Sequence, residues 1–220
     1  MAPMKVELMK HVSPIEVAPQ ARTRGPTRRA LAKQQTRAKV LAGARKLFAE
    51  HGYQGATIRD IASAAGMSTG AVFANFADKH DLFRDIMAAD LEQIAADMRE
   101  AASRGATVED ALARAFGAGY AFYRQQMPLA RAWLAAGWSG EEGETLRALP
   151  QAALIPALIE ELLAAAAARG ELAGKSDLKL RGQMLYEAFL SAFRPAIFEG
   201  WTGEALQAHA RDQIRILVGR

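Results

Sequence analysis

Residues 57–76 read TIRDIASAAGMSTGAVFANF, and this stretch predicts two short helices that cross at a tight turn. Counted from Ile58, the small residue Ala62 stands at the fifth position, Gly66 at the ninth and Val72 at the fifteenth. Ala62 permits close approach of the helices, Gly66 can adopt the positive φ of a sharp turn, and Val72 closes a small core. This is the helix-turn-helix arrangement, whose second helix typically lies in the major groove of DNA.

The charge of the chain is divided between its two ends. Residues 1–80 hold 13 Lys or Arg against 5 Asp or Glu, a balance of +8, whereas residues 81–220 hold 15 against 19, a balance of −4. Between Val17 and Ala49 there are nine basic residues and no acidic one. A basic run alone could be a solvated tail that aids solubility. Next to a helix-turn-helix, however, it is typical of nucleic-acid binding.

The sequence offers no pattern for catalysis or cofactor binding. It has no Cys, and its four His residues lie too far apart for a local metal-binding motif. We find no nucleophile–base pair, no carboxylate dyad and no phosphate-binding loop of the GxxxxGK[ST] type. We therefore expect a protein that is not an enzyme, with no catalytic residue, no metal and no cofactor.

The hydropathy of the chain gives no sign of a membrane partner. Nowhere do 18 apolar residues run together, and the first ten residues lack the apolar core of a secretory signal. We expect a soluble cytoplasmic protein, associated with the nucleoid through its DNA.

Apolar periodicity predicts an all-α fold. A first helix is expected from about Thr27 or Gln34 to His51, where Gly52 can end it in a left-handed cap. Ser68 is a suitable N-cap for the second helix of the helix-turn-helix, and a further helix is expected from near Lys79 towards Ser103. Later helices, for a total of about nine, are expected over 107–126, 128–136, about 145–169, 177–199 and 203–218. Pro156 and Pro195 should kink or restart theirs.

The string from Lys46 to Leu82, KLFAEHGYQGATIRDIASAAGMSTGAVFANFADKHDL, resembles the DNA-binding domain of TetR/AcrR-type transcriptional regulators. The resemblance covers roughly residues 34–83. It implies an all-helical homodimer in which three N-terminal helices bind an operator and the remaining helices bind a ligand and dimerise. The expected division is then a basic mobile arm over 1–33, a helix-turn-helix domain over 34–80, and a helical effector-binding and dimerisation domain over 81–220.

The same resemblance implies which residues contact DNA. The groove-facing side of the second helix of the helix-turn-helix would carry Thr69, Gly70, Ala71, Phe73, Ala74 and Asn75. Thr57 and Arg59 would approach the DNA backbone and flanking bases, and Lys79 would meet a phosphate at the start of the next helix. We add Ser68 as a polar group of the same helix and Arg37 from the basic run.

The chain departs from the family pattern at Phe73. This position is commonly Tyr, whose hydroxyl contacts phosphate, and Phe73 retains only the ring. Ala71 and Ala74 are also short, so direct readout would depend on Thr and Ala meeting thymine methyl groups and on Asn75 reading adenine. We expect the arginine-rich arm to compensate, by entering a neighbouring minor groove or by tracking phosphates.

Aromatic residues gather in the segment 107–138, as the walls of a small-molecule pocket would require. A helical core uses aromatic residues equally often, so both interpretations stay open. Arg124 or Arg131 could hold an anionic or aromatic ligand. The candidate pocket residues are Phe116, Tyr120, Tyr123, Arg124, Arg131, Trp133, Trp138, Tyr186 and Phe189.

The last two expected helices carry long apolar stripes, which run from Leu178 to Ile197 and from Leu206 to Leu217. A homodimer through these two helices would cover both stripes, and packing within one chain is the alternative. Together these features predict a dimeric repressor of a palindromic operator that a small-molecule effector releases. The helix that begins at Lys79 would act as the lever between ligand and DNA. A ligand-independent DNA-organising or assembly protein is the alternative function.

Overall fold

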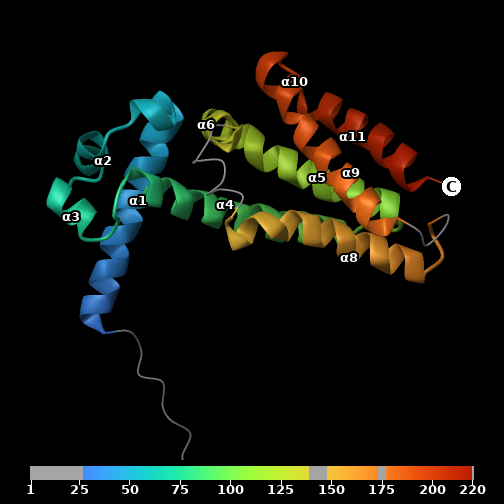
Figure 1. The fold of residues 1–220 in the computed structure, drawn as a ribbon, viewed down its shortest axis with the longest axis horizontal. Helices are drawn as coiled ribbons and strands as arrows, with labels where there is room; N and C mark the ends of the chain where they lie inside the picture. The colour runs from blue at the N-terminus through green and yellow to red at the C-terminus, as the bar shows by residue number, and fades with distance from the viewer. Residues whose placement is uncertain (1–26, 139–147, 173–176, 220) are drawn as a thin grey trace, which may run out of the picture.

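The computed structural model describes residues 27–138, 148–172 and 177–219, without the side chains of 133–138. Within these ranges every regular element is helical, so the all-α prediction is confirmed. Helices α1, α2 and α3 form a block at one end of the molecule, and α4 runs from this block into an elongated layer of helices α5, α6 and α8 to α11 (Figure 1).

Helix α1, Arg28–Gly55, begins at an N-cap, Thr27, whose hydroxyl accepts a hydrogen bond from the Ala30 amide at 3.2 Å. The earlier of the two expected starts is therefore correct, and residues 28–33 of the expected arm are helical; residues 1–26 lie outside the described residues. Gly52 has the positive φ that was predicted, 71°, but its ψ of 172° is not that of a left-handed cap, and it kinks α1, which continues to Gly55.

Helices α2, Ile58–Ala64, and α3, Thr69–Phe73, form the predicted pair. Thr57 and Ser68 are their N-caps, and Gly66 between them has φ 67°. Their shared core consists of buried Ile61, Ala62 and Val72. The turn and the core therefore lie at the positions predicted from Ala62, Gly66 and Val72.

Helix α4, Lys79–Ala102, starts at the N-cap Asp78 and packs along α5, Val108–Gln125. Helix α6, Met127–Trp138, follows after one residue, Gln126, and packs against α1. A 3-10 turn, η1, spans Pro150–Ala153 and leads into α8, Leu154–Ala168.

The segment expected as one helix over 177–199 is two helices in the structure, α9, Leu178–Ser191, and α10, Phe193–Phe198. Pro195 is the third residue of α10, and Pro156 is the third residue of α8. Both prolines therefore lie in a first turn, where the missing N–H costs no helical hydrogen bond. The sequence predicted that each proline would either kink its helix or begin a new one, and in the structure a new helix begins.

The last helix, α11, spans Gly203–Val218, and its apolar stripe faces into the protomer. Leu206, Ala210 and Ile214 are buried, and α11 packs against α5 and α9. The buried residues of α9 and α10, such as Leu185 and Phe193, lie in the same core. Packing within one chain, the alternative that the sequence left open, therefore covers the stripe of α11, and α5 supplies much of the covering layer.

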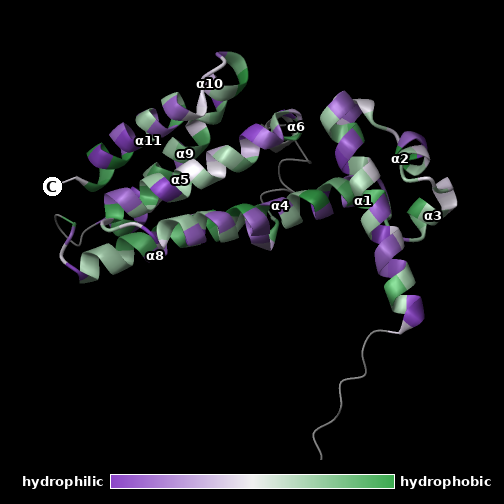
Figure 2. Cartoon of the chain, turned by 180° about the vertical axis from the view of Figure 1, so that it is seen from behind, coloured by the Kyte–Doolittle hydropathy of each residue, from purple (hydrophilic) through white to green (hydrophobic). Residues whose placement is uncertain are grey.

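Polar and apolar residues are distributed unevenly along the helices (Figure 2). Hydrophilic segments recur along the part of α1 that extends away from α2 and α3. The stretch Pro150–Ala168 is the only described helix that is long and apolar enough to cross a membrane by length and composition, and it contains Glu160 and Glu161. Core helices of soluble proteins pass the same test. Only 28% of this window is buried in the protomer, which leaves much of α8 uncovered.

Candidate DNA-binding surface and its junction with the helical core

Helix α3 presents most of its predicted contact residues to solvent. Thr69, Gly70 and Ala74 are exposed, and the Phe73 ring is 56% exposed although it is apolar. On the opposite side, buried Val72 anchors the helix to the core. Five residues of helix thus display a short, mostly carbon surface, with Ala71 half-buried at its edge.

The capping hydroxyl groups of this unit bind the backbone of their own helices. Ser68 Oγ accepts from the Ala71 amide at 3.2 Å, and Thr57 Oγ1 accepts from the Asp60 amide at 3.2 Å. Thr57 also donates to the Asp60 carboxylate at 2.5 Å. Satisfying amides in a first turn stabilises a short helix that could not form alone. Arg59, one residue into α2, is exposed to solvent.

Asn75 directs its side-chain amide back into the protein. Its Nδ2 donates to the Ala71 carbonyl at 2.9 Å, and its own carbonyl accepts from Arg37 at 2.9 Å. The Oδ1 atom is buried. In this position Asn75 closes the C-terminal end of α3, and reading adenine would require these bonds to break.

Arg37 connects three parts of the N-terminal block. In addition to Asn75, its guanidinium binds the Asp85 carboxylate of α4 and lies over the Phe76 ring, 4.2 Å from the ring centroid. A planar guanidinium can satisfy all three partners at once. The predicted DNA contact is therefore engaged inside the protein.

Lys79 lies at the start of α4, as predicted, and its ammonium turns towards the end of α1. Nζ donates to the Tyr53 carbonyl at 2.8 Å and lies 4.4 Å from the centroid of the Tyr53 ring. Cations are favoured beside the carbonyl groups that a helix end leaves unpaired. Lys79 thus ties α4 to the segment that follows Gly52.

A buried ion pair joins this block to the helical core. Arg45 of α1 donates to both carboxylate oxygens of Asp90 on α4, at 2.9 and 2.5 Å, and to Gln126 Oε1 at 2.6 Å. Asp90 is only 5% exposed and is the one charged residue buried among those the structure describes. Burial raises the pKa of the Asp90 carboxyl, and the hydrogen bonds and charge of Arg45 oppose this rise.

The family model that matches the chain is that of the bacterial regulatory proteins of the tetR family, and it matches residues 40–86. Those residues comprise the exposed α3, its capped partner α2 and the adjoining parts of α1 and α4. The chain carries a TetR-family DNA-binding domain.

Curated relatives match about a third of the chain. The HTH-type transcriptional repressor AcnR of Corynebacterium glutamicum is 46% identical over 74 residues, which are 34% of this chain and 37% of that protein. The chain thus matches about a third of the length of its curated relatives.

Two solved structures resemble the fold as a whole. The fatty acid degradation regulator FadR from Bacillus halodurans has a TM-score of 0.72 at 19% identity, covering 84% of this chain and 95% of that one. FadR from Bacillus subtilis, solved in complex with stearoyl-CoA, has a TM-score of 0.71 at 18% identity, covering 83% and 97%. At this identity the likeness concerns the fold.

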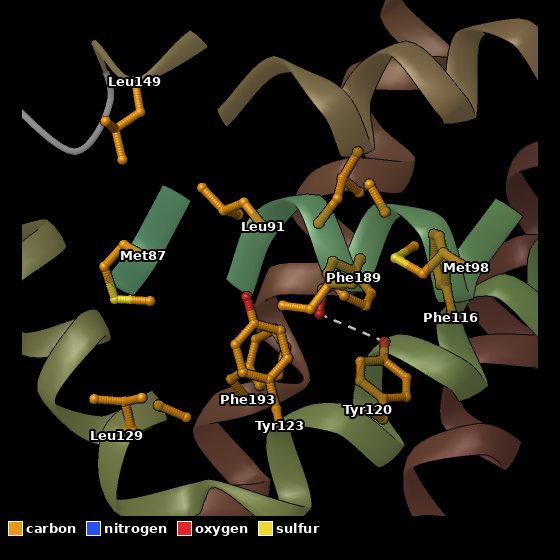
Figure 3. Packing of buried hydrophobic residues seen from close by; sticks show 14 of the residues in the cluster. Met87, Leu91, Met98, Phe116, Tyr120, Tyr123, Leu129, Leu149, Phe189 and Phe193 are labelled. Atoms are coloured by element: carbon orange, nitrogen blue, oxygen red, sulfur yellow. Dashed lines mark hydrogen bonds between the residues drawn. The ribbon is translucent and has the colours of Figure 1, made fainter. Parts of the chain in front are cut away.

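Behind the TetR-family domain, several predicted pocket residues pack into an aromatic cluster made of Phe116, Tyr120, Tyr123, Phe189 and Phe193 (Figure 3). Ring centroids lie 5.1 Å apart for Phe116–Phe189 and Tyr120–Phe189, and 4.4 Å apart for Tyr123–Phe193. Burial raises the pKa of the Tyr120 and Tyr123 hydroxyls, so both stay neutral at physiological pH. In this structure these rings pack as a core, which is the second interpretation left open by the sequence.

The other predicted pocket residues do not join this cluster. Arg124 and Arg131 are exposed, and Arg131 donates to the Ile197 carbonyl at 3.0 Å. Tyr186 is half-buried and lines a groove between α8 and α9. The side chains of Trp133 and Trp138 lie outside the described residues.

The groove between α8 and α9 is open to solvent and has a volume of about 860 Å³. Apolar side chains line much of it, among them exposed Leu180 and Met184 of α9 and Pro156 of α8. Glu160 and Glu187 add charge. An exposed apolar groove along two helices is typical of a helix-pairing surface.

The sequence contained a weak signal for the junction that its interpretation missed. Asp90 lies three residues after Met87 and directly before Leu91, on the apolar face of α4. The helical spacing therefore predicts that its side chain is buried. A charge on an apolar face indicates a buried partner. Arg45, 45 residues away, could not be chosen as that partner from spacing alone.

Proposed function

We propose that the protein is a dimeric DNA-binding transcriptional regulator that represses from a palindromic operator and is released by a small-molecule effector. The exposed surface of α3 on a TetR-family domain is the observation that carries this proposal. The curated relative AcnR of Corynebacterium glutamicum, which matches a third of this chain, is named a transcriptional repressor. A regulator of this kind works on the chromosome in the cytoplasm.

The residues proposed to meet DNA divide into two groups. Thr69, Gly70, Ala71, Phe73 and Ala74 enter the major groove, with Ser68 and Arg59 beside them. Arg37, Thr57, Asn75 and Lys79 contribute by holding α3 and its neighbours in place, because their polar groups bind the protein itself. Affinity for the phosphate backbone of DNA would then depend on the exposed cations of α1.

Replacing both Arg29 and Lys33 with Gln should make operator binding less sensitive to salt. The two residues lie one turn apart on the exposed start of α1. The slope of the logarithm of the operator-binding constant against the logarithm of salt concentration is negative. Its magnitude should decrease by about 0.9 for each DNA phosphate that the variant no longer neutralises, as measured by fluorescence anisotropy at several salt concentrations. Arg211→Gln on α11 is the control and should leave the slope unchanged. An unaltered slope in the double variant would remove the start of α1 from the interface.

Phe73→Tyr should tighten operator binding about 5- to 10-fold. The ring is already held half in solvent, and a hydroxyl at its tip can donate to a phosphate oxygen, an interaction of roughly 1–1.5 kcal/mol. Titration of labelled operator with wild-type and variant protein measures the change. Phe198→Tyr, on an exposed ring of α10, should have no effect; equal affinities for Phe73→Tyr and wild type would place this ring away from phosphate.

The homodimer is proposed to form through the groove between α8 and α9 instead of through the apolar stripe of α11. That stripe is already covered, whereas Leu180 and Met184 of α9 are exposed apolar side chains that line the groove. A twofold axis there would pair the same surface from each protomer. Two α3 helices about 34–36 Å apart would then read one palindrome.

The effector is proposed to act in the helical region behind the TetR-family domain. The solved relative bound to stearoyl-CoA favours ligand control over the ligand-independent alternative, and it makes stearoyl-CoA the first compound to test. A coupling of about 1–3 kcal/mol would change operator affinity about 5- to 150-fold.

Selection of bound sequences from random duplexes tests the proposed function. The expected result is a palindromic consensus, bound by two protomers. Adding stearoyl-CoA to that complex then tests release. A protein that enriches no sequence would contradict the proposal.

A further inference from the structure

We propose that Arg45, Asp90 and Gln126 are positioning residues for operator binding, which transmit the state of the aromatic cluster to the TetR-family domain through α1. This inference rests on the proposed function and adds a route that runs beside α4. The three residues come from α1, from α4 and from the corner between α5 and α6. They meet where the N-terminal block joins the helical core.

The geometry of the set makes it sensitive to position. Two guanidinium nitrogens of Arg45 bind the two oxygens of Asp90, and one of them also binds Gln126. Such a forked arrangement fixes both the distance between the two side chains and their relative orientation. A buried ion pair adds little net stability over apolar residues of the same size, so its orienting effect is the more distinctive property.

Gln126 couples this set to the corner of α5 and α6. It is the C-cap residue of α5; its amide donates to the Tyr123 carbonyl at 3.1 Å, and its carbonyl accepts from the Ala130 amide at 2.9 Å. Its side chain is half-buried. Any shift of the corner therefore moves the oxygen that Arg45 binds.

Tyr123 turns the aromatic cluster towards α4, the helix that carries Asp90. Its ring lies edge-on to Phe193, and its hydroxyl points towards α4 between Met87 and Leu91 (Figure 3). The pKa of this hydroxyl is raised mainly by burial, then by Tyr186 and by the charge of Asp90. A ligand that displaces rings of the cluster would thus disturb the surroundings of Asp90.

At the DNA-binding end of the protein, α1 carries a displacement of the Arg45 junction to α3. Arg37 lies eight residues before Arg45 on α1, and its guanidinium binds the carbonyl of Asn75 at the end of α3. The same guanidinium pairs with Asp85 of α4. A rotation of α1 relative to α4 would therefore change the position of α3.

Operator DNA itself is the probe for this coupling, because linkage between two sites is reciprocal. If α3 and the α5–α6 corner are coupled, binding of the selected operator must slow amide hydrogen exchange over residues 123–132. Full-length wild type, Gln126→Ala, Gln126→Glu and Arg99→Met are compared by mass spectrometry. Gln126→Glu keeps the oxygen that Arg45 binds. Arg99→Met removes another interhelical ion pair of α4, with Glu161, away from the junction.

Wild type, Gln126→Glu and Arg99→Met should show this protection, and Gln126→Ala should lose it and bind operator about 5-fold more weakly or worse. A merely structural role of Gln126 would lower thermal stability without removing the protection. Unchanged protection in Gln126→Ala, its loss in Arg99→Met, or its absence in wild type bound to operator would each overturn the inference. Failure of the proposed function is distinguishable, because wild type would then bind no duplex selectively.

Discussion

Replacing Phe189 with Ala is expected to lower the free energy of unfolding by about 3–5 kcal/mol. Phe189 is fully buried, and its ring contacts those of Phe116, Tyr120 and Phe193 at centroid distances of 5.1, 5.1 and 5.4 Å. A Cβ built on Gly119 would lie 2.8 Å from the same ring, which shows how closely α5 approaches it. The destabilisation combines transfer of the ring to water with a cavity that rigid neighbours cannot fill.

Urea denaturation followed by circular dichroism measures this destabilisation. Phe198→Ala is the matched control, since this ring is 79% exposed and should change stability by less than about 0.5 kcal/mol. A decrease below about 1 kcal/mol for Phe189→Ala would mean that the cluster is loosely packed, as a ligand cavity between the rings would require.

Replacing Arg45 with Met should lower the free energy of unfolding by about 3 kcal/mol at pH 8 and by less at pH 5. The carboxyl of Asp90 would then be buried without its cation, and the figure is at the low end because the Arg45 side chain is 35% exposed. Burial already raises the pKa of Asp90, and Arg45 supplies the two opposing effects. Without Arg45 the pKa rises further above its unfolded value.

The sign of the pH dependence follows from that rise. An acid whose folded pKa exceeds its unfolded pKa takes up a proton on folding, so the variant keeps most stability at low pH and loses it as the pH rises through the folded pKa. Denaturation of wild type and variant from pH 5 to pH 8 measures the difference. Arg114→Met breaks the exposed pair with Asp110 and should show little destabilisation at any of these values. A pH-independent destabilisation for Arg45→Met would mean that water reaches Asp90.

The helix-turn-helix could be predicted from sequence because its determinants are local. Ser68 and Thr57 cap helices that begin at the next residue, and Gly66 supplies its own positive φ. Each of these features depends on neighbours within a few positions. The same reason explains why the starts of α4 and α11 were predicted close to their observed positions.

Long-range partners could not be predicted in the same way. The basic run suggested exposed cations, yet Arg37 pairs with residues 38 and 48 positions away, and Lys79 binds a carbonyl 26 positions away. The stripe of α11 indicated that Leu206 and Ile214 would be buried, and periodicity does not reveal whether the covering helix comes from the same chain. Only the packing of α5 against α11 answers that question.

The small side chains of α3 have a chemical consequence for the DNA that it would recognise. Glycine, alanine and a phenylalanine ring offer carbon atoms and almost no hydrogen-bonding groups. Such a surface distinguishes base pairs by the methyl groups that line the groove. If α3 enters the groove as proposed, exchanging thymine for uracil would remove an apolar contact and adding a methyl group to cytosine would create one, so base methylation would alter the affinity of this surface for DNA.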